Sequence, residues 1–242
     1  MLSLSIFAFT ALAAQNNKRF ELALSMHSNA PVHISYSDVN QGGGTFSRRG
    51  YAVGIMGKYF THEGFAYRLQ AVFSQRNNLF EGGQRQLDGS YDKSRSEYYQ
   101  SVVRVVPGLQ WGFQQNRVSL HGGLGLPFTL IGKYIQELDY KAFNPANIQT
   151  YQVGSKNQAP GGFSVGMGIF AGSNFMLSKR LQIGLEFGAA YQYTAIGDKV
   201  KFESIERTSN VTNKSKSEYV AKFREFDFTN VNGSILLSYV FN

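Results

Sequence analysis

Alternation of large apolar residues with small or polar ones is the feature that most limits how this chain can fold. In the segment LQIGLEFGAAYQY, residues 181–193, every odd position except Ala189 is large and apolar or aromatic. The even positions hold glycine, alanine, glutamine and one carboxylate, Glu186. Successive side chains of a strand point to opposite faces. The segment therefore predicts a β-strand with one bulky apolar face and one small, polar face.

The same alternation recurs through the chain and predicts eight strands. Their approximate ranges are 20–26, 51–59, 65–74, 99–113, 118–129, 163–175, 181–193 and 232–241. Phe226 and Phe228 are out of phase with Ile235, which predicts a β-bulge near residues 230–233. No run of about 18 apolar residues occurs, so a membrane-spanning helix is excluded. A content of 14% aromatic residues with 26 glycines and 5 prolines also favours an all-β chain.

The connections between these strands alternate in length. Short turns are expected at residues 61–64, 114–116 and 177–180, and long polar segments at 28–50, 76–97, 132–162 and 195–225. Tight turns at one end and long loops at the other are typical of outer-membrane barrels, whose turns face the periplasm. We therefore expect an eight-stranded antiparallel up-and-down transmembrane β-barrel with short periplasmic turns and long, mobile extracellular loops. Strand-like pieces within the long segments, such as residues 199–202 and 219–223, predict extended hairpins that rise beyond the bilayer, with a ten-stranded barrel as the alternative.

A soluble eight-stranded barrel shows the same alternation with the faces exchanged. The small face here is rich in glycine, serine, alanine and glutamine and carries about one charge per strand, which suits a narrow, crowded interior. We therefore expect the bulky face to meet lipid. Aromatic residues near the strand ends predict interfacial girdles, formed by Tyr59, Phe65, Trp111, Phe113, Tyr191, Tyr193 and Tyr239.

The beginning of the chain predicts export. Residues 1–14 form an apolar run that ends in small residues, as in a secretory signal peptide, although the basic residues that normally precede such a run are missing and the start is expected to be truncated. We expect residues 15–242 to form one barrel domain, with no second domain.

These patterns, and the aromatic ending Tyr239-Val240-Phe241, resemble those of small outer-membrane barrel proteins of the OmpA, OmpX and opacity-protein type. More specifically, the chain is similar to the outer-membrane β-barrel domain proteins of bacteroidete-type bacteria. The resemblance implies a Gram-negative outer membrane, contact with its lipid and lipopolysaccharide, and Tyr239 and Phe241 as the signal read by the barrel-assembly machinery. Asn242 follows the aromatic residue that usually closes such a chain, so this signal departs from the family pattern.

Six ionisable residues are expected on the inward face: Glu21, Lys58, Arg68, Arg104, His121 and Glu186. Glu21 and Lys58 are expected to pair across neighbouring strands, and Glu186 to reach Arg68 or Arg104 across the lumen. Unpaired buried charges are costly. We therefore expect a structural charge network that closes the lumen, with a gated narrow channel as the alternative.

Signals for chemistry are weak. His27-Ser28-Asn29-Ala30 resembles the motif of outer-membrane lipid A deacylases without its spacer residue, and adjacent strand residues point to opposite faces, so His27 does not readily activate Ser28. Cysteine is absent, and the four histidines are dispersed without metal-ligand spacing. The net charge is +8, but basic residues are interleaved with acidic ones, which argues against nucleic-acid binding. We expect no catalytic residues, no cofactor and no metal.

The favoured function is therefore that of a non-enzymatic, monomeric outer-membrane protein that supports the envelope or binds an extracellular ligand through its loops. Six aromatic residues are candidate loop contacts: Tyr36, Phe80, Tyr91, Tyr134, Tyr140 and Tyr151. A small passive solute channel and, less favoured, a lipid-modifying enzyme remain the alternatives.

Overall fold

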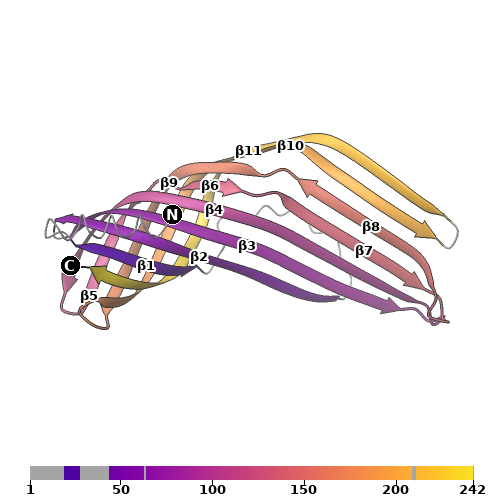
Figure 1. The fold of residues 1–242 in the computed structure, drawn as a ribbon, viewed down its shortest axis with the longest axis horizontal. Helices are drawn as coiled ribbons and strands as arrows, with labels where there is room; N and C mark the ends of the chain where they lie inside the picture. Colours follow the sequence, from indigo (N-terminus) through magenta and orange to yellow (C-terminus); the bar gives the residue numbers. More distant parts are fainter. Residues whose placement is uncertain (1–18, 28–43, 63, 209–210, 242) are drawn as a thin grey trace.

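The computed structural model describes residues 19–27, 44–62, 64–208 and 211–241, which form a single antiparallel sheet of eleven strands (Figure 1). The strands are β1 (Phe20–His27), β2 (Gly44–His62), β3 (Phe65–Arg85), β4 (Tyr91–Gln115), β5 (Val118–Gly125), β6 (Phe128–Ile131), β7 (Tyr134–Phe143), β8 (Gln149–Ala159), β9 (Gly162–Met176), β10 (Leu181–Thr208) and β11 (Thr212–Phe241). The predicted signal peptide lies outside the described residues, so the division at residue 14 stays a prediction.

The sheet closes on itself into a ring of eight strands. β1 pairs with β2 on one side and β11 on the other, and the pairing continues through β3, β4, β9 and β10 back to β11. β5 and β6 both lie between β4 and β9 and act as one wall strand. They are separated at Leu126-Pro127, where proline has no backbone N–H to donate to a ladder. The eight-stranded prediction is confirmed for the described residues.

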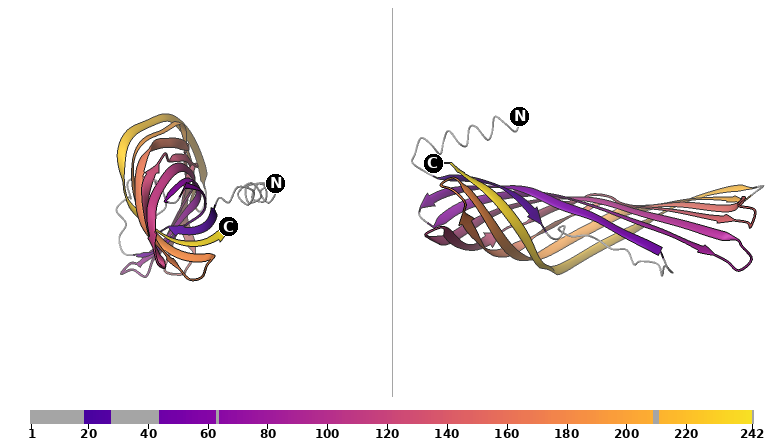
Figure 2. Two further views of the ribbon diagram at one scale, coloured as in Figure 1. Left: turned by 90° about the vertical axis from the view of Figure 1, so that its left-hand side faces the viewer. Right: turned by 90° about the horizontal axis from the view of Figure 1, so that it is seen from below.

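Beyond the ring, the sheet continues as an extension on one side. β2, β3, β4, β10 and β11 run on past the barrel, and β7 and β8 fill the space between β4 and β10 (Figures 1 and 2). The long connecting segments are thus largely paired hairpins that rise beyond the barrel, as their strand-like pieces predict, and the mobility of these segments stays a prediction. Residues 28–43 of the first segment lie outside the described part. Cross-strand charge pairs explain why polar sequence forms strands here. Examples are Lys156–Glu137 at 2.6 Å and Lys216–Glu203 at 2.9 Å.

The predicted turns and bulge appear where expected. β3, β5 and β10 each begin within five residues of the end of the preceding strand. Asn116, in the turn between β4 and β5, has a φ of 55°. Between Gly188 and Ala190 on β10, the partners on β11 change from Asn232 to Thr229. β11 therefore advances three residues while β10 advances two, so the extra residue lies within the predicted bulge.

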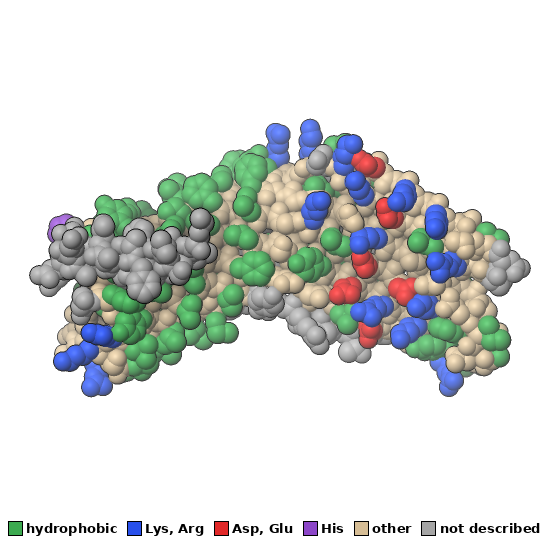
Figure 3. Space-filling model, viewed as in Figure 1, with side chains coloured by type: hydrophobic (Ala, Val, Ile, Leu, Met, Phe, Trp, Pro, Cys, Tyr) green, Lys and Arg blue, Asp and Glu red, His purple; other side chains and the backbone are tan. Residues whose placement is uncertain are grey.

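The two faces of the barrel wall differ in the direction that the sequence predicts. Bulky side chains point outward and are exposed, such as Leu24 (60%), Phe187 (55%) and Met167 (68%), whereas Lys58 and Gln192 inside are 0% and 1% exposed. In Figure 3 the hydrophobic side chains gather over the barrel, and basic and acidic ones over the extension. Soluble proteins rarely expose so continuous an apolar surface, and a closed barrel satisfies its backbone groups within lipid. The barrel is therefore a transmembrane one. The described residues contain no helix that is long and apolar enough to cross a membrane.

Candidate functional site

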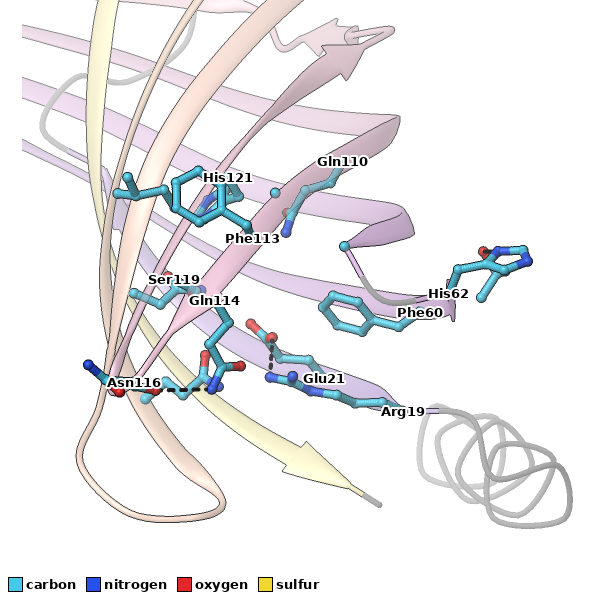
Figure 4. Close-up of a pocket in the computed structure, with 16 residues that line it drawn as sticks. Arg19, Glu21, Phe60, His62, Gln110, Phe113, Gln114, Asn116, Ser119 and His121 are labelled. Atoms are coloured by element: carbon cyan, nitrogen blue, oxygen red, sulfur yellow. Dashed lines mark hydrogen bonds and ion pairs between the residues drawn. The ribbon is translucent and has the colours of Figure 1, made fainter.

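The lumen contains a buried ion pair near the end with the tight turns. Glu21, Lys58 and Arg68 lie side by side in one row of the ladder, on β1, β2 and β3. Lys58 Nζ lies 2.9 Å from Glu21 Oε1, and both side chains are almost fully buried. Arg19 Nη2 is 4.0 Å from the other carboxylate oxygen of Glu21 (Figure 4). The structure thus brings Glu21 and Lys58 together.

A second buried pair crosses the lumen. Arg68 donates from Nη1 to Glu186 Oε2 at 2.8 Å and from Nη2 to Glu186 Oε1 at 2.9 Å, a bidentate geometry that fixes both side chains. His121 Nε2 lies 3.3 Å from Glu186 Oε2. Of the two arginines that Glu186 was expected to reach, the structure selects Arg68, because Arg104 has no hydrogen bond or ion pair with any described residue.

Phe170 is a lumen residue that the sequence analysis missed. It stands on the inward face of β9 between Gly168 and Gly172, and its ring centroid lies 3.8 Å from Arg68 Cζ. This cation–π contact adds an aromatic wall to the Arg68–Glu186 pair. Phe170 also fills the space beside Gly123, where an added Cβ would meet both its ring and the Leu109 carbonyl oxygen. The alternation of the strand could have predicted its inward direction, because Phe170 is in phase with the inward residues Gly168 and Gly172.

Apolar clusters further fill the lumen, so its interior is less polar than predicted. Ala23, Met56 and Leu236 form one buried cluster. Val102, Ile131 and Ile196 form another. Together with the charge pairs, these clusters place side chains inside the barrel at several levels.

Two cavities lie on either side of the Arg68–Glu186–His121 group. The larger one, about 770 Å³, occupies the mouth at the turn end (Figure 4). Buried amide side chains of Gln110, Asn174 and Gln182 line it, as does His121. The smaller one, about 80 Å³, is lined by charged and polar residues that include His27, Arg68, Gln70, Arg104 and Glu186.

The predicted girdle residues divide between two levels of the barrel. Trp111, Phe113 and Tyr239 are exposed on the outer face toward the turn end, where Tyr59 and Phe65 are half-buried. Tyr191 is exposed toward the extension, and Tyr193 packs against Phe226 with ring centroids 4.8 Å apart. In the C-terminal pair, Tyr239 and Phe241 pack edge to face at 4.7 Å. A girdle and an assembly signal remain proposed roles for these residues.

Most candidate loop aromatics pack within the extension. Tyr134 is buried beside Tyr98, with ring centroids 6.0 Å apart, and Phe80 is 8% exposed. Tyr140 meets Tyr151 edge to face at 6.3 Å. Tyr91 lies 6.0 Å from Phe143, and Tyr36 lies outside the described residues. Packing within the sheet accounts for these aromatics.

His27 is the one residue of the histidine motif that lies within the described part of the chain. His27 Nε2 lies 2.9 Å from Ser25 Oγ, and Ser25 is 2% exposed and faces the lumen. Within the described part of the chain, no carboxylate hydrogen-bonds to His27, and no cluster of three or more His, Asp or Glu side chains is arranged to hold a metal ion. Ser28, Asn29 and Ala30 lie outside the described residues. Among the described residues, His27 is therefore paired with a serine that faces the lumen and not the outer lipid.

A closed ring of strands, an apolar outer band and an ionised interior are the features of an outer-membrane β-barrel, and the described part of the chain has all three.

Comparisons with known proteins are distant. A family model described as "Protein of unknown function (DUF3575)" matches residues 128–225. A search of curated proteins finds no match. Among solved structures, the chain is similar to the outer membrane protein OprG from Pseudomonas aeruginosa, with 17% identity over 93% of this chain and 94% of that one and a TM-score of 0.40. It is also similar to a major outer membrane protein from Thermus thermophilus, with 12% identity over 93% and 99% and a TM-score of 0.35.

Proposed function

We propose that this chain is a non-enzymatic outer-membrane protein with a closed lumen, which supports the envelope and binds partners through its extracellular extension. The filling of the lumen is the observation that carries the proposal. The Glu21–Lys58 pair, the Arg68–Glu186 pair with Phe170, and the cluster around Ile196 all lie inside the barrel. Side chains packed at these positions support a lumen that solutes do not cross.

The extension is the surface proposed for contacts outside the membrane. Its exposed strands carry Lys201, Arg207, Lys214, Lys222 and Arg224. Their positive charge suits the phosphates of lipopolysaccharide at the outer leaflet. An extracellular ligand bound by the hairpin tips, a monomeric state, and assembly through the barrel-assembly machinery belong to the same proposal.

Planar-bilayer recording of the purified protein tests the closed lumen. We expect no steady conductance from the wild type and brief openings from the triple variant Arg68→Ser, Glu186→Ser and Phe170→Ala, which removes one whole layer. The matched control Phe187→Ala, on the outer face, should stay silent. Stable open levels in the wild type would contradict the proposal and favour a small passive channel.

A further inference from the structure

We propose that the 80 Å³ cavity inside the barrel is a binding site for a small inorganic anion, a halide such as chloride. The cavity lies within the lumen and is lined by three ionised side chains, Arg68, Arg104 and Glu186. With His27 neutral, two cations and one anion leave a net charge of 2 − 1 = +1 around the cavity.

Arg104 carries the unbalanced charge. It lies on the inward face of β4, in the ladder row that contains Val72 of β3, Gly54 of β2 and Ser25 of β1. None of these residues is acidic. The charge of Glu186 is paired with Arg68, which donates to both of its oxygens, and His121 lies 3.3 Å from one of them. Arg104 is half-buried with its Nε atom fully buried, and no described residue supplies a counter-charge to its guanidinium. Withdrawal of an unpaired charge from water is unfavourable, and a bound anion reduces this cost.

Unused donors lie around the same cavity. Gln70 Oε1 accepts a hydrogen bond from Arg68 Nη2 at 3.3 Å, which fixes its amide orientation. Its buried Nε2 therefore faces elsewhere and has no partner, and Gln70 is only 7% exposed. The Nε atoms of Arg68 and Arg104 are buried without a partner as well. Three unpaired donors call for a ligand that only accepts hydrogen bonds, which is the property of a halide and not of a cation.

The volume and the lining of the cavity further restrict which anion it can bind. Its 80 Å³ compares with about 30 Å³ for one water molecule in the liquid. It therefore admits one halide with a water molecule and excludes an organic anion as large as a sugar acid. The apolar residues Val72, Val106 and Pro127 line it too, and low local polarity strengthens charge-assisted hydrogen bonds. Water alone would satisfy the donors without balancing Arg104.

Refolding the full chain into detergent with bromide, or with gluconate at equal ionic strength, tests the site. Crystals from the bromide sample should show an anomalous peak beside Arg104. Urea unfolding should give an unfolded fraction about tenfold smaller in bromide than in gluconate, at about ten times the bromide dissociation constant. Absence of both effects would overturn the proposal in favour of a water-filled cavity.

Three variants separate anion binding from a general effect of salt. Arg104→Met should fold without any bromide effect. Gln70→Glu keeps Arg104 but supplies an internal acceptor and counter-charge, so it should also abolish the effect, which keeps the test valid if Arg104→Met does not fold. Arg117→Gln, at an exposed turn, should retain the full effect. An equal bromide effect in Gln70→Glu and the wild type would refute the site.

Discussion

The substitution Glu186→Gln tests the buried charge network most sharply. It keeps the shape of the side chain and removes the negative charge that faces Arg68 at 2.8 and 2.9 Å. The Arg68 and Glu186 side chains are only 2% and 7% exposed, so bulk water screens an unpaired guanidinium poorly. Two unit charges about 4 Å apart interact by about 4 kcal/mol at an effective dielectric constant of about 20. Removal of one partner of a buried pair costs ~3–5 kcal/mol. We expect a loss of this size in the free energy of unfolding.

The assay is urea unfolding of the refolded barrel in lipid vesicles, followed by the fluorescence of Trp111. Trp111 is the only tryptophan of the chain and is 47% exposed on the outer face, so its emission reports the loss of the lipid-facing wall. The double variant Arg68→Met with Glu186→Met should recover most of the loss, because no unpaired charge remains. Glu203→Gln breaks an exposed pair with Lys216 and should have no resolvable effect. A loss for Glu186→Gln no larger than that for Glu203→Gln would refute the buried network.

Two further predictions concern packing and pH. Gly123→Ala places a Cβ against the Leu109 carbonyl oxygen and the Phe170 ring, and it should lower the free energy of unfolding by ~1–3 kcal/mol in the same urea assay. The control Gly154→Ala should have little effect, because no atom lies within 4 Å of the added Cβ. Equal losses of stability in the two variants would contradict the packing described. The hydrogen bond from Lys216 lowers the pKa of Glu203 below its ordinary value of 4.5. The pair therefore stabilises the extension fully above pH 4.5, and this stabilisation is lost as the pH falls through the lowered pKa. Amide hydrogen exchange in the β10–β11 hairpin should therefore speed up in acid relative to exchange in the barrel strands, and equal acceleration in both would show that the pair has no local role.

The wall of the barrel could be predicted from the sequence because strand geometry converts alternation directly into two faces. Leu185 and Glu186 are neighbours in sequence, and their residue types alone assign one to lipid and the other to the lumen. The bulge was predictable for the same reason, since Phe228 and Ile235 cannot lie on one face of a regular strand.

The extension and the pairings inside the lumen were less accessible to prediction. Lys156 and Glu137 look like loop residues in sequence, and only the register of β7 against β8 brings them together. Glu186 pairs with Arg68 and not with Arg104, and this pairing depends on how strands far apart in the ring face each other across the lumen. Phe170 broke the expectation that the inward face is small, and its role depends on the glycine opposite it, Gly123.

The orientation of the two wall faces is the claim on which the membrane assignment depends, and nitroxide scanning along β10 tests it most directly. The chain has no cysteine, so single cysteines for labelling can be introduced at Ile183, Leu185 and Phe187 and at Gln182 and Gln192. In vesicles, we expect frequent collisions of the label with dissolved oxygen at the three odd positions, and immobile, poorly accessible labels at the two even ones. Oxygen-accessible labels at the even positions with immobile ones at the odd positions would contradict the account.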